Sequence, residues 1–113
     1  MDYTLNRIEV RGNVGEDARI SKFGDNCVAR FQVATNYSYR DKDGQPVIET
    51  TWHNIVAWEG RGMPDFALIK KGAFIYACGR LRVSKFTNSE GEEKRVYEIV
   101  ANRLQLVKPE DFA

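Results

Sequence analysis

The sequence has few of the residues from which metal sites, disulfide frameworks and most catalytic centres are built. Its 113 residues include two cysteines and one histidine. Cys27 and Cys78 each lie in an apolar stretch, at a spacing that matches no metal-binding pattern. The sequence contains no nucleophile motif and no glycine-rich phosphate loop. We therefore predict a protein that is not an enzyme and that holds no metal or other cofactor.

The sequence also lacks a signal peptide and any long apolar segment, so we expect a soluble, reduced, cytoplasmic chain. Its length fits one domain, with a core large enough to fold without metal or disulfide support. The formal net charge is only +1, which argues against a histone-like nucleic-acid binder. Any attraction for phosphate must therefore come from the placement of the charges.

The charges are distributed unevenly along the chain. No acidic residue lies between Asp65 and Glu90. Five cations fall in that gap: Lys70, Lys71, Arg80, Arg82 and Lys85. Such a run indicates either a phosphate-binding track or simply a solvated face.

The segment from Thr51 to Trp58 is the most informative part of the chain. Alternation along a strand places Trp52 and Trp58 on one face, and Ile55 and Ala57 on the other. The face with the two indoles is the one that a compact domain would normally present to water. It is suited to stacking on a flat partner such as a nucleobase. The alternative is that both indoles are half-buried packing residues at a subunit contact.

Strand patterns separated by Gly, Asn and Asp turns dominate the rest of the chain. We expect strands over residues 5–14, 19–23, 27–36, 51–58, 73–86 and 95–107, and one short helix within 60–72. Five long strands, with a helix between the third and fourth of them, predict an all-β Greek-key barrel of the OB-fold class, which binds oligonucleotides. Residues 1–107 would form this domain, and 108–113 would be a short disordered end.

Aromatic and basic side chains gather on two of the predicted strands. The 73–86 segment alternates Phe74, Tyr76, Arg80, Arg82 and Phe86 onto one face. We expect this strand to lie next to the tryptophan strand, so that the two together supply stacking surfaces and cations. Residues 37–45 are predicted to form a polar hairpin tip that carries Tyr39.

Several short motifs together give the chain a family resemblance. They are Gly12-Asn13-Val14-Gly15-Glu16-Asp17, Ala34-Thr35-Asn36, Arg40-Asp41-Lys42, Thr51-Trp52-His53, Lys71-Gly72, Gly79-Arg80-Leu81-Arg82 and Lys85-Phe86-Thr87. With them the chain resembles bacterial single-stranded DNA-binding proteins over about residues 5 to 107. The resemblance implies sequence-independent binding of single-stranded DNA in replication, recombination and repair. It also implies a homotetramer of two dimers, in the cytoplasm and associated with the nucleoid.

The resemblance also implies site residues. The family's four base-stacking positions fall on Tyr39, Trp52, Trp58 and Phe86. Tyr39 and Phe86 stand where tryptophan is often found, and their smaller rings predict weaker stacking. Phosphate contacts are expected from the basic residues Arg7, Arg11, Arg30, Lys42, Arg80, Arg82, Lys85 and Lys94.

Three residues are expected at a subunit interface. The alternation phase of His53 points it toward the side of Ile55 and Ala57, and the resemblance places that position near a subunit contact. Phe74 and Tyr76 offer apolar area for packing between subunits.

Family members usually continue into a long disordered linker with an acidic tip that recruits replication and repair enzymes. This sequence ends at Lys108-Pro109-Glu110-Asp111-Phe112-Ala113. Glu110, Asp111 and Phe112 have the residue types of that tip but little reach, so we expect a short variant in which recruitment is weakened. The alternative function is an OB-fold protein-interaction or replication-restart accessory subunit that binds nucleic acid weakly. Retention of all four aromatic positions argues against it.

Overall fold

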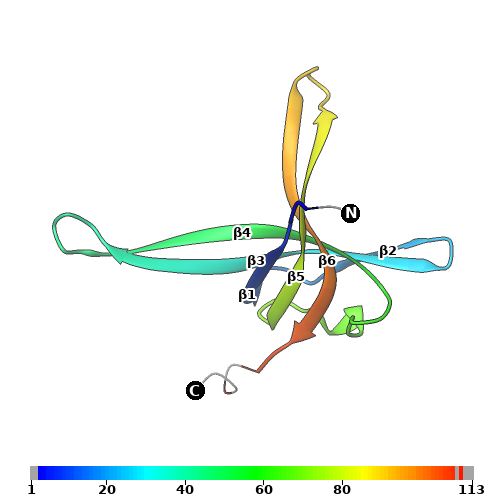
Figure 1. Cartoon of the computed structure of the whole chain (residues 1–113), viewed down its shortest axis with the longest axis horizontal. Helices are drawn as coiled ribbons and strands as arrows, with labels where there is room; N and C mark the ends of the chain where they lie inside the picture. The colour runs from blue at the N-terminus through cyan, green and yellow to red at the C-terminus, as the bar shows by residue number, and fades with distance from the viewer. Residues whose placement is uncertain (1–2, 109, 111–113) are drawn as a thin grey trace.

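The computed structural model describes residues 3–108 and 110, and within this part the chain forms β-strands and a single 3-10 turn (Figure 1). The elements are β1 (Ile8–Val14), β2 (Arg19–Phe23), β3 (Asn26–Arg40), β4 (Pro46–Trp58), η1 (Phe66–Leu68), β5 (Phe74–Thr87) and β6 (Glu93–Leu106). Each strand overlaps the residue range expected from alternation, and β2 matches its predicted bounds, but β1 begins later, at Ile8, while β3 ends later, at Arg40, and β4 begins earlier, at Pro46.

The strands form one sheet in the order β1-β5-β6-β4-β3-β2. The sheet closes into a barrel because β1 also pairs with β3, at Asn13 with Ala34 and at Val14 with Val33. Closure brings two backbones close together: a Cβ on Gly12 would lie 2.0 Å from the Ala34 carbonyl oxygen, so only glycine fits there. The predicted all-β OB-fold barrel is confirmed.

Alternate residues of the strands other than β2 fill the barrel. Ile55 and Ala57 of β4 point inward and are buried, as the alternation predicts. The same period of two buries Val10, Val14, Ala29, Phe31, Val33, Ile75 and Ala77 of the other strands. It does not bury Leu81 and Val83, which continue the phase of Ile75 and Ala77 along β5 but are exposed. The opposite, outward phase of β3 and β4 is exposed at Arg30, Gln32, Trp52 and Trp58, whereas Val28 and Val56 of that phase are buried.

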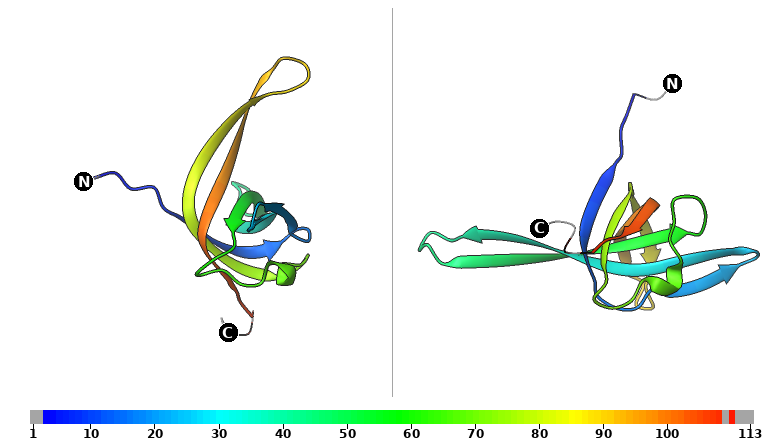
Figure 2. Two further views of the ribbon diagram at one scale, coloured as in Figure 1. Left: turned by 90° about the vertical axis from the view of Figure 1, so that its right-hand side faces the viewer. Right: turned by 90° about the horizontal axis from the view of Figure 1, so that it is seen from below.

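Two hairpins extend beyond the barrel as separate arms (Figures 1 and 2). We call β3–β4 beyond the Ala34–Trp52 pair the first arm, and β5–β6 beyond the Arg82–Glu98 pair the second arm. Both tips have the same construction. The Oδ1 atom of Asp41 accepts hydrogen bonds from two later backbone N–H groups, and Oδ1 of Asn88 does the same.

Two of the predicted elements differ in the structure. The helix expected within 60–72 is reduced to the 3-10 turn Phe66–Leu68, capped by the Asp65 carboxylate, which accepts from the Ala67 N–H at 3.0 Å. The glycines at both ends of this segment and Pro64 leave too few residues to offset the cost of nucleating an α-helix. The polar tip expected at 37–45 is shorter, because β3 continues to Arg40 in an unbroken ladder with β4.

The prediction that the tryptophan strand, β4, lies next to β5 in the sheet is wrong. β6 lies between them, antiparallel to β5 and parallel to β4. This parallel pairing joins segments some forty residues apart in the sequence, and alternation within a strand carries no information about such partners. The β5–β6 ladder also contains a bulge. Cys78 pairs with Arg103 and Gly79 with Ala101, so Asn102 is an extra residue in β6.

Candidate nucleic-acid interface

The outward phase of β4 presents both tryptophans to solvent. Trp52 is 52% exposed and Trp58 is 44% exposed. Asn54 and Val56 lie between them on the same phase, and we call these four residues the platform. Large aromatic side chains that stay exposed on a flat strand face are surfaces for stacking.

The ring of Trp52 rests on the backbone of Gly15. A Cβ at Gly15 would lie 2.6 Å from Cζ3 of Trp52, closer than any side chain allows. The N–H of Gly15 donates to the carbonyl oxygen of Gln32 at 3.1 Å, which ties the loop after β1 to β3. The glycine therefore gives the indole a fixed floor.

Trp58 has an aromatic neighbour that the sequence reasoning missed. The ring of Phe23, at the end of β2, lies with its centroid 5.9 Å from that of Trp58, tilted by 52°. Phe23 is itself exposed. Its signal in the sequence is an apolar ring beside the Gly24-Asp25 turn, where a polar residue is usual. Phe23 enlarges the aromatic surface at this end of the platform.

A groove of about 730 Å³ runs beside the platform. Asn54 and Val56 of the platform line it, with Gln32 of β3 and Val96 of β6. Its charged lining residues come from several elements and are Glu16, Asp17, Arg19, Arg30, Lys71 and Glu98. The groove therefore offers apolar, amide and charged groups next to two stacking surfaces.

Glu98 lies at the centre of this outer face and is only 7% exposed. It pairs with Asn54 on β4 and with Arg82 on β5. The Oε1 atom of Glu98 accepts from Nη2 of Arg82 at 2.5 Å and from Nε of Arg82 at 3.1 Å. The hydroxyl of Ser84 lies 3.3 Å from Oε1, and Nη1 of Arg30 lies 3.5 Å from Oε2. The sequence signal for Glu98 is a carboxylate within the otherwise apolar run from Val96 to Ala101 of β6.

The structure brings Trp52 and Trp58 together but places the other two stacking candidates on separate arms. Tyr39 is 40% exposed on the first arm and contacts Tyr37, with ring centroids 6.1 Å apart. The register partner of Tyr39 is Val47, and that of Trp52 is Ala34. Ala34 and Tyr39 are separated by an odd number of positions along β3. Tyr39 therefore has the opposite phase to Trp52.

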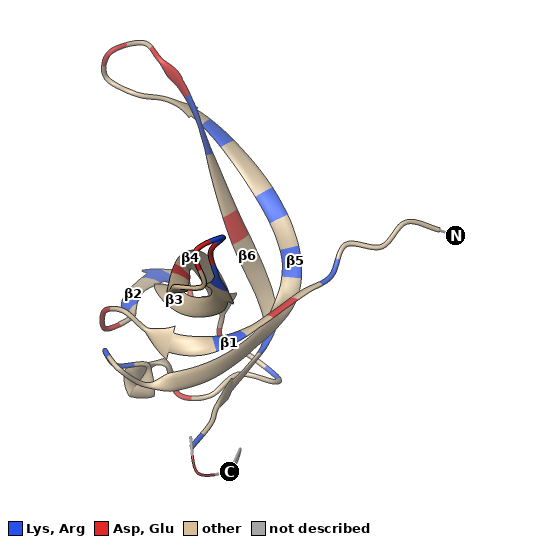
Figure 3. Cartoon of the chain, turned by 90° about the vertical axis from the view of Figure 1, so that its left-hand side faces the viewer, with Lys and Arg blue, Asp and Glu red and all other residues tan. Residues whose placement is uncertain are grey.

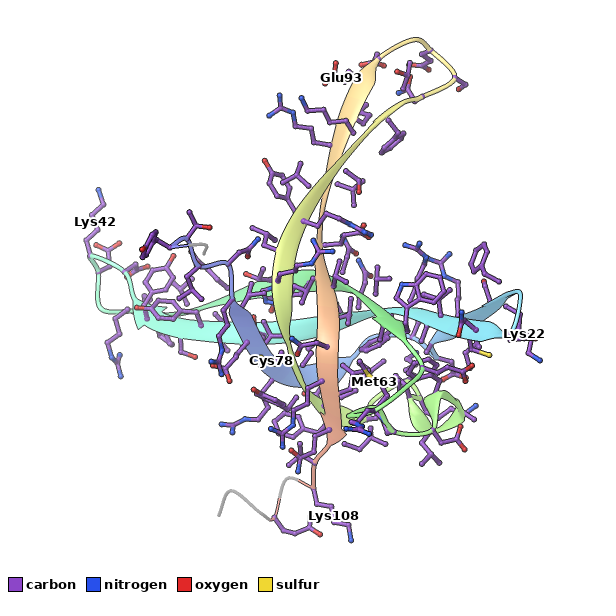
Figure 4. All side chains as sticks on the ribbon, turned by 45° about the vertical axis from the view of Figure 1, so that its right-hand side comes forward. Lys22, Lys42, Met63, Cys78, Glu93 and Lys108 are labelled. Carbon is purple, nitrogen blue, oxygen red and sulfur yellow. The ribbon has the colours of Figure 1, made fainter. Side chains whose placement is uncertain are left out.

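Phe86 is 49% exposed and lies near the end of the second arm. Its register partner is Lys94, and the period of two gives it the phase of Arg82 and Ser84. Phe86 thus faces the same side of the arm as the Glu98 contacts. Figure 4 shows how far apart the two arms end, with Lys42 at one tip and Glu93 near the other.

The predicted phosphate ligands fall into two groups. Lys and Arg positions recur along β5 (Figure 3), and Lys42 lies at the tip of the first arm (Figure 4). Three cations form exposed ion pairs, namely Arg7–Glu9 at 3.7 Å, Lys85–Glu93 at 4.0 Å and Lys94–Glu92 at 3.6 Å. Such exposed pairs are weak and can exchange for phosphate. Arg11 and Arg80 are exposed on β1 and β5. Arg30 and Arg82 differ, because both contact the buried Glu98.

The predicted interface residues come from different faces of the sheet. His53 has the inward phase of β4 and is partly buried, and its Nε2 atom lies 2.8 Å from Oγ1 of Thr35. Burial lowers the pKa of His53. Phe74 and Tyr76 have the outward phase of β5 and are partly buried. The hydroxyl of Tyr76 donates to Oε2 of Glu9, which raises the pKa of Tyr76 to about 12.

Some features bear on other functions. Within residues 3–108 and 110, His, Cys, Asp and Glu form no group of three that could hold a metal ion. Cys27 and Cys78 are both free thiols. In the same part of the chain, no helix has the length and apolar character that crossing a membrane requires. Asp111 and Phe112 of the predicted tip lie outside the described residues.

The chain is similar to named proteins over most of its length. It is 31% identical over 105 residues to a single-stranded DNA-binding protein of Neisseria meningitidis serogroup A, covering 92% of this chain and 60% of that protein. It is 33% identical over 106 residues to single-stranded DNA-binding protein 1 of Xylella fastidiosa strain 9a5c, covering 92% of this chain and 78% of that protein. The chain thus spans about 60% of the length of the Neisseria relative.

A solved structure shares the fold. The Plasmodium falciparum SSB complex with ssDNA superimposes with a TM-score of 0.80 at 29% identity, covering 95% of this chain and 96% of that one. The model of the single-strand binding protein family matches residues 5–107. The barrel, its exposed indoles and this match over nearly the whole sequence lead to one conclusion: the chain belongs to the single-strand binding protein family.

Proposed function

We propose that this protein binds single-stranded DNA without sequence preference and protects it during replication, recombination and repair. The observation that carries the proposal is the platform, where two exposed indoles flank a groove on the outer face of the barrel. The names of the relatives support it, as does the bound ssDNA in the Plasmodium complex. No covalent chemistry is required for this function.

In this mechanism, bases stack on aromatic rings while cations meet the phosphates. Trp52 and Trp58 form the central stacking surface, and Tyr39 and Phe86 supply further stacking rings on the two arms, Tyr39 on the face of its ribbon opposite to that of Trp52. The proposed phosphate contacts are the exposed cations Arg7, Arg11, Lys42, Arg80, Lys85 and Lys94. Stacking is worth about 1–3 kcal/mol per base whatever the base is, and phosphate contacts carry no sequence information. Together they give affinity without sequence preference.

The test is a titration with poly(dT) followed by intrinsic tryptophan fluorescence. The sequence contains two tryptophans, and both lie on the platform, so the signal reports directly on the proposed site. We expect strong quenching by poly(dT) and much weaker quenching by duplex DNA of equal phosphate concentration. Absence of quenching and of binding would contradict the proposal and favour an accessory protein-interaction module.

We further propose that the protein acts as a homotetramer in the cytoplasm. One barrel offers only a short binding face, and several subunits would extend it. The second arm supports such assembly, because it exposes Val83 and Tyr97 on the phase opposite to Phe86, and Leu81, just before the arm, is exposed on the same phase as Val83. Light scattering at micromolar concentration should give four times the subunit mass, and a monomer would contradict this assembly.

A further inference from the structure

The groove beside the platform has a carboxylate, not a free cation, at its centre. Glu98 is nearly buried, and its two oxygens are occupied by groups from β5, which pairs with β6, and from β3, which lies one strand further away beyond β4. Arg82 binds Oε1 through two nitrogens, and Arg30 approaches Oε2 from the opposite side at 3.5 Å. Arg30, which lines the groove, and Arg82, on the neighbouring strand β5, are thus already engaged by an internal anion. The other two cations that line the groove are Arg19 and Lys71.

This pairing differs from the other ion pairs around the site. In Lys85–Glu93 both side chains are about three-fifths exposed, so water can take over either partner when the pair opens. The side chain of Glu98 is only 9% exposed. If Arg82 turned away to a phosphate, a buried carboxylate would lose its closest donor, which is strongly unfavourable. A phosphate placed on Arg82 would also face the negative charge of Glu98.

We propose that Glu98 keeps phosphates away from the groove floor, so that the groove receives the edges of nucleobases while the phosphates follow the exposed cations outside. Arg30 and Arg82 are then positioning residues that hold the carboxylate and the base of the second arm. This inference rests on the proposed binding of single-stranded DNA and specifies how the strand is oriented on the barrel.

The neighbours of Glu98 suit a base edge. The Nε2 group of Gln32 donates to Oδ1 of Asn54 at 2.9 Å, and Nδ2 of Asn54 donates to the Tyr97 carbonyl oxygen at 3.2 Å. These bonds fix the two amides. Gln32 keeps its Oε1 acceptor and a second N–H donor, since an amide has two of each. A donor and an acceptor side by side match the edges of every base, and both amides line the groove next to Trp52.

The experiment compares salt dependence between matched variants. Poly(dT) affinity of the wild type, Glu98→Gln and Glu93→Gln is measured over a series of NaCl concentrations. Both substitutions remove one negative charge from β6, but Glu93 is exposed and has the opposite phase on the second arm. Each cation that newly meets a phosphate steepens the slope of log K against log salt by about 0.7. We expect Glu98→Gln to steepen the slope by about 0.7 to 1.4, and Glu93→Gln to leave it unchanged.

A second pair of variants tests the inference from the arginine side, and thermal melts establish that each variant folds before its salt slope is compared. Arg82→Gln is expected to leave the salt slope unchanged, whereas Arg80→Gln, two residues away on the same phase of β5, should flatten it by about 0.7. Equal slopes for Glu98→Gln and Glu93→Gln, or an Arg82→Gln slope as flat as that of Arg80→Gln, would overturn the inference. A wild type that poly(dT) fails to quench would instead overturn the proposed function.

Discussion

The platform and the two arms carry the same kind of side chain on very different supports. Trp52 and Trp58 stand on a central strand whose other phase is packed into the barrel. Trp52 has Gly15 beneath its ring, and Trp58 has Phe23 beside it. Tyr39 and Phe86 stand instead on two-stranded ribbons beyond the barrel. A ribbon of two strands has little stability of its own.

This difference shows that the exposed fraction of an aromatic side chain does not by itself determine how much the side chain contributes to binding affinity. The exposed fractions of the four rings are similar, between 40% and 52%. Rings held in place before binding lose less conformational freedom when a base arrives, so more of their stacking energy appears as affinity. We therefore expect the platform to dominate binding and the arms to extend it.

The largest expected effect is that of Trp52→Ala. Loss of its stacking surface should weaken poly(dT) binding by about 1–3 kcal/mol. Tyr39→Ala and Phe86→Ala should each cost about 1 kcal/mol or less, because their smaller rings lie on less ordered supports. Fluorescence titration measures all three, with Trp58 as the remaining reporter in Trp52→Ala. The salt slope should stay unchanged in each variant, and arm losses equal to that of Trp52→Ala would contradict the ranking.

Gly15→Ala tests the support beneath Trp52 without removing the ring. The new methyl group must displace the indole, so we expect a loss of about 1 kcal/mol in poly(dT) affinity, a fraction of the stacking term. A double-mutant cycle supplies the control: in a Trp52→Ala background, Gly15→Ala should have no further effect on binding. Additive losses would mean that Gly15 acts through the loop and not through the ring.

The contribution of single cations to phosphate binding can also be compared between the barrel and the first arm. Arg80→Gln, on the barrel part of β5, should flatten the salt slope by about 0.7. Lys42→Gln, at the tip of the first arm, should change it less, because a flexible ribbon keeps its cation near a phosphate for only part of the time. Measured slopes for poly(dT) at several NaCl concentrations check this order. A larger change for Lys42→Gln would show the first arm to be the main phosphate contact.

The smallest expected effect concerns the point where the first arm leaves the barrel. Burial lowers the pKa of His53 below its ordinary value of 6.5, so the unfolded chain takes up the proton first as the pH falls. Stability is therefore retained above pH 6.5 and declines below it. His53 is the only histidine, so His53→Gln should flatten the pH dependence near 6.5 in thermal melts. Unchanged pH dependence in that variant would contradict this assignment.

The sequence was enough to predict the barrel and the platform, because both depend on a local period. Alternation identifies the buried phase of each strand, and with it the outward phase of Trp52 and Trp58. Which strands lie beside β4, and which side chains therefore surround the platform, depends on pairing between segments that are distant in the sequence. That β6 lies between β4 and β5 could not be read from the chain, and so neither could the position of Glu98 among the arginines.

The face on which Tyr39 lies could not be predicted from the sequence, for a different reason. The phase of Tyr39 relative to Trp52 follows only if β3 is known to continue unbroken to Arg40. The last residues of β3 are all exposed. Their backbone N–H and C=O groups are hydrogen-bonded to β4 in the hairpin, so the strand can continue without burying side chains. The helix expected within 60–72 does not form, although Phe66 and Ile69 are buried in the core, because burial of these two side chains requires only a single turn.

The pairing pattern of the barrel has a consequence for the order in which the molecule assembles. The β3–β4 and β5–β6 ladders join segments that are close in sequence, whereas β1 meets β5 through pairs such as Ile8 with Gly79. Local pairs form early, and distant ones must await loop closure. On a ribosome, the strand that bears Trp52 can find its hairpin partner long before β5 is synthesised. The tryptophans would then be exposed on an unclosed sheet, and the nascent chain would depend on rapid synthesis of its second half to bury the face behind them.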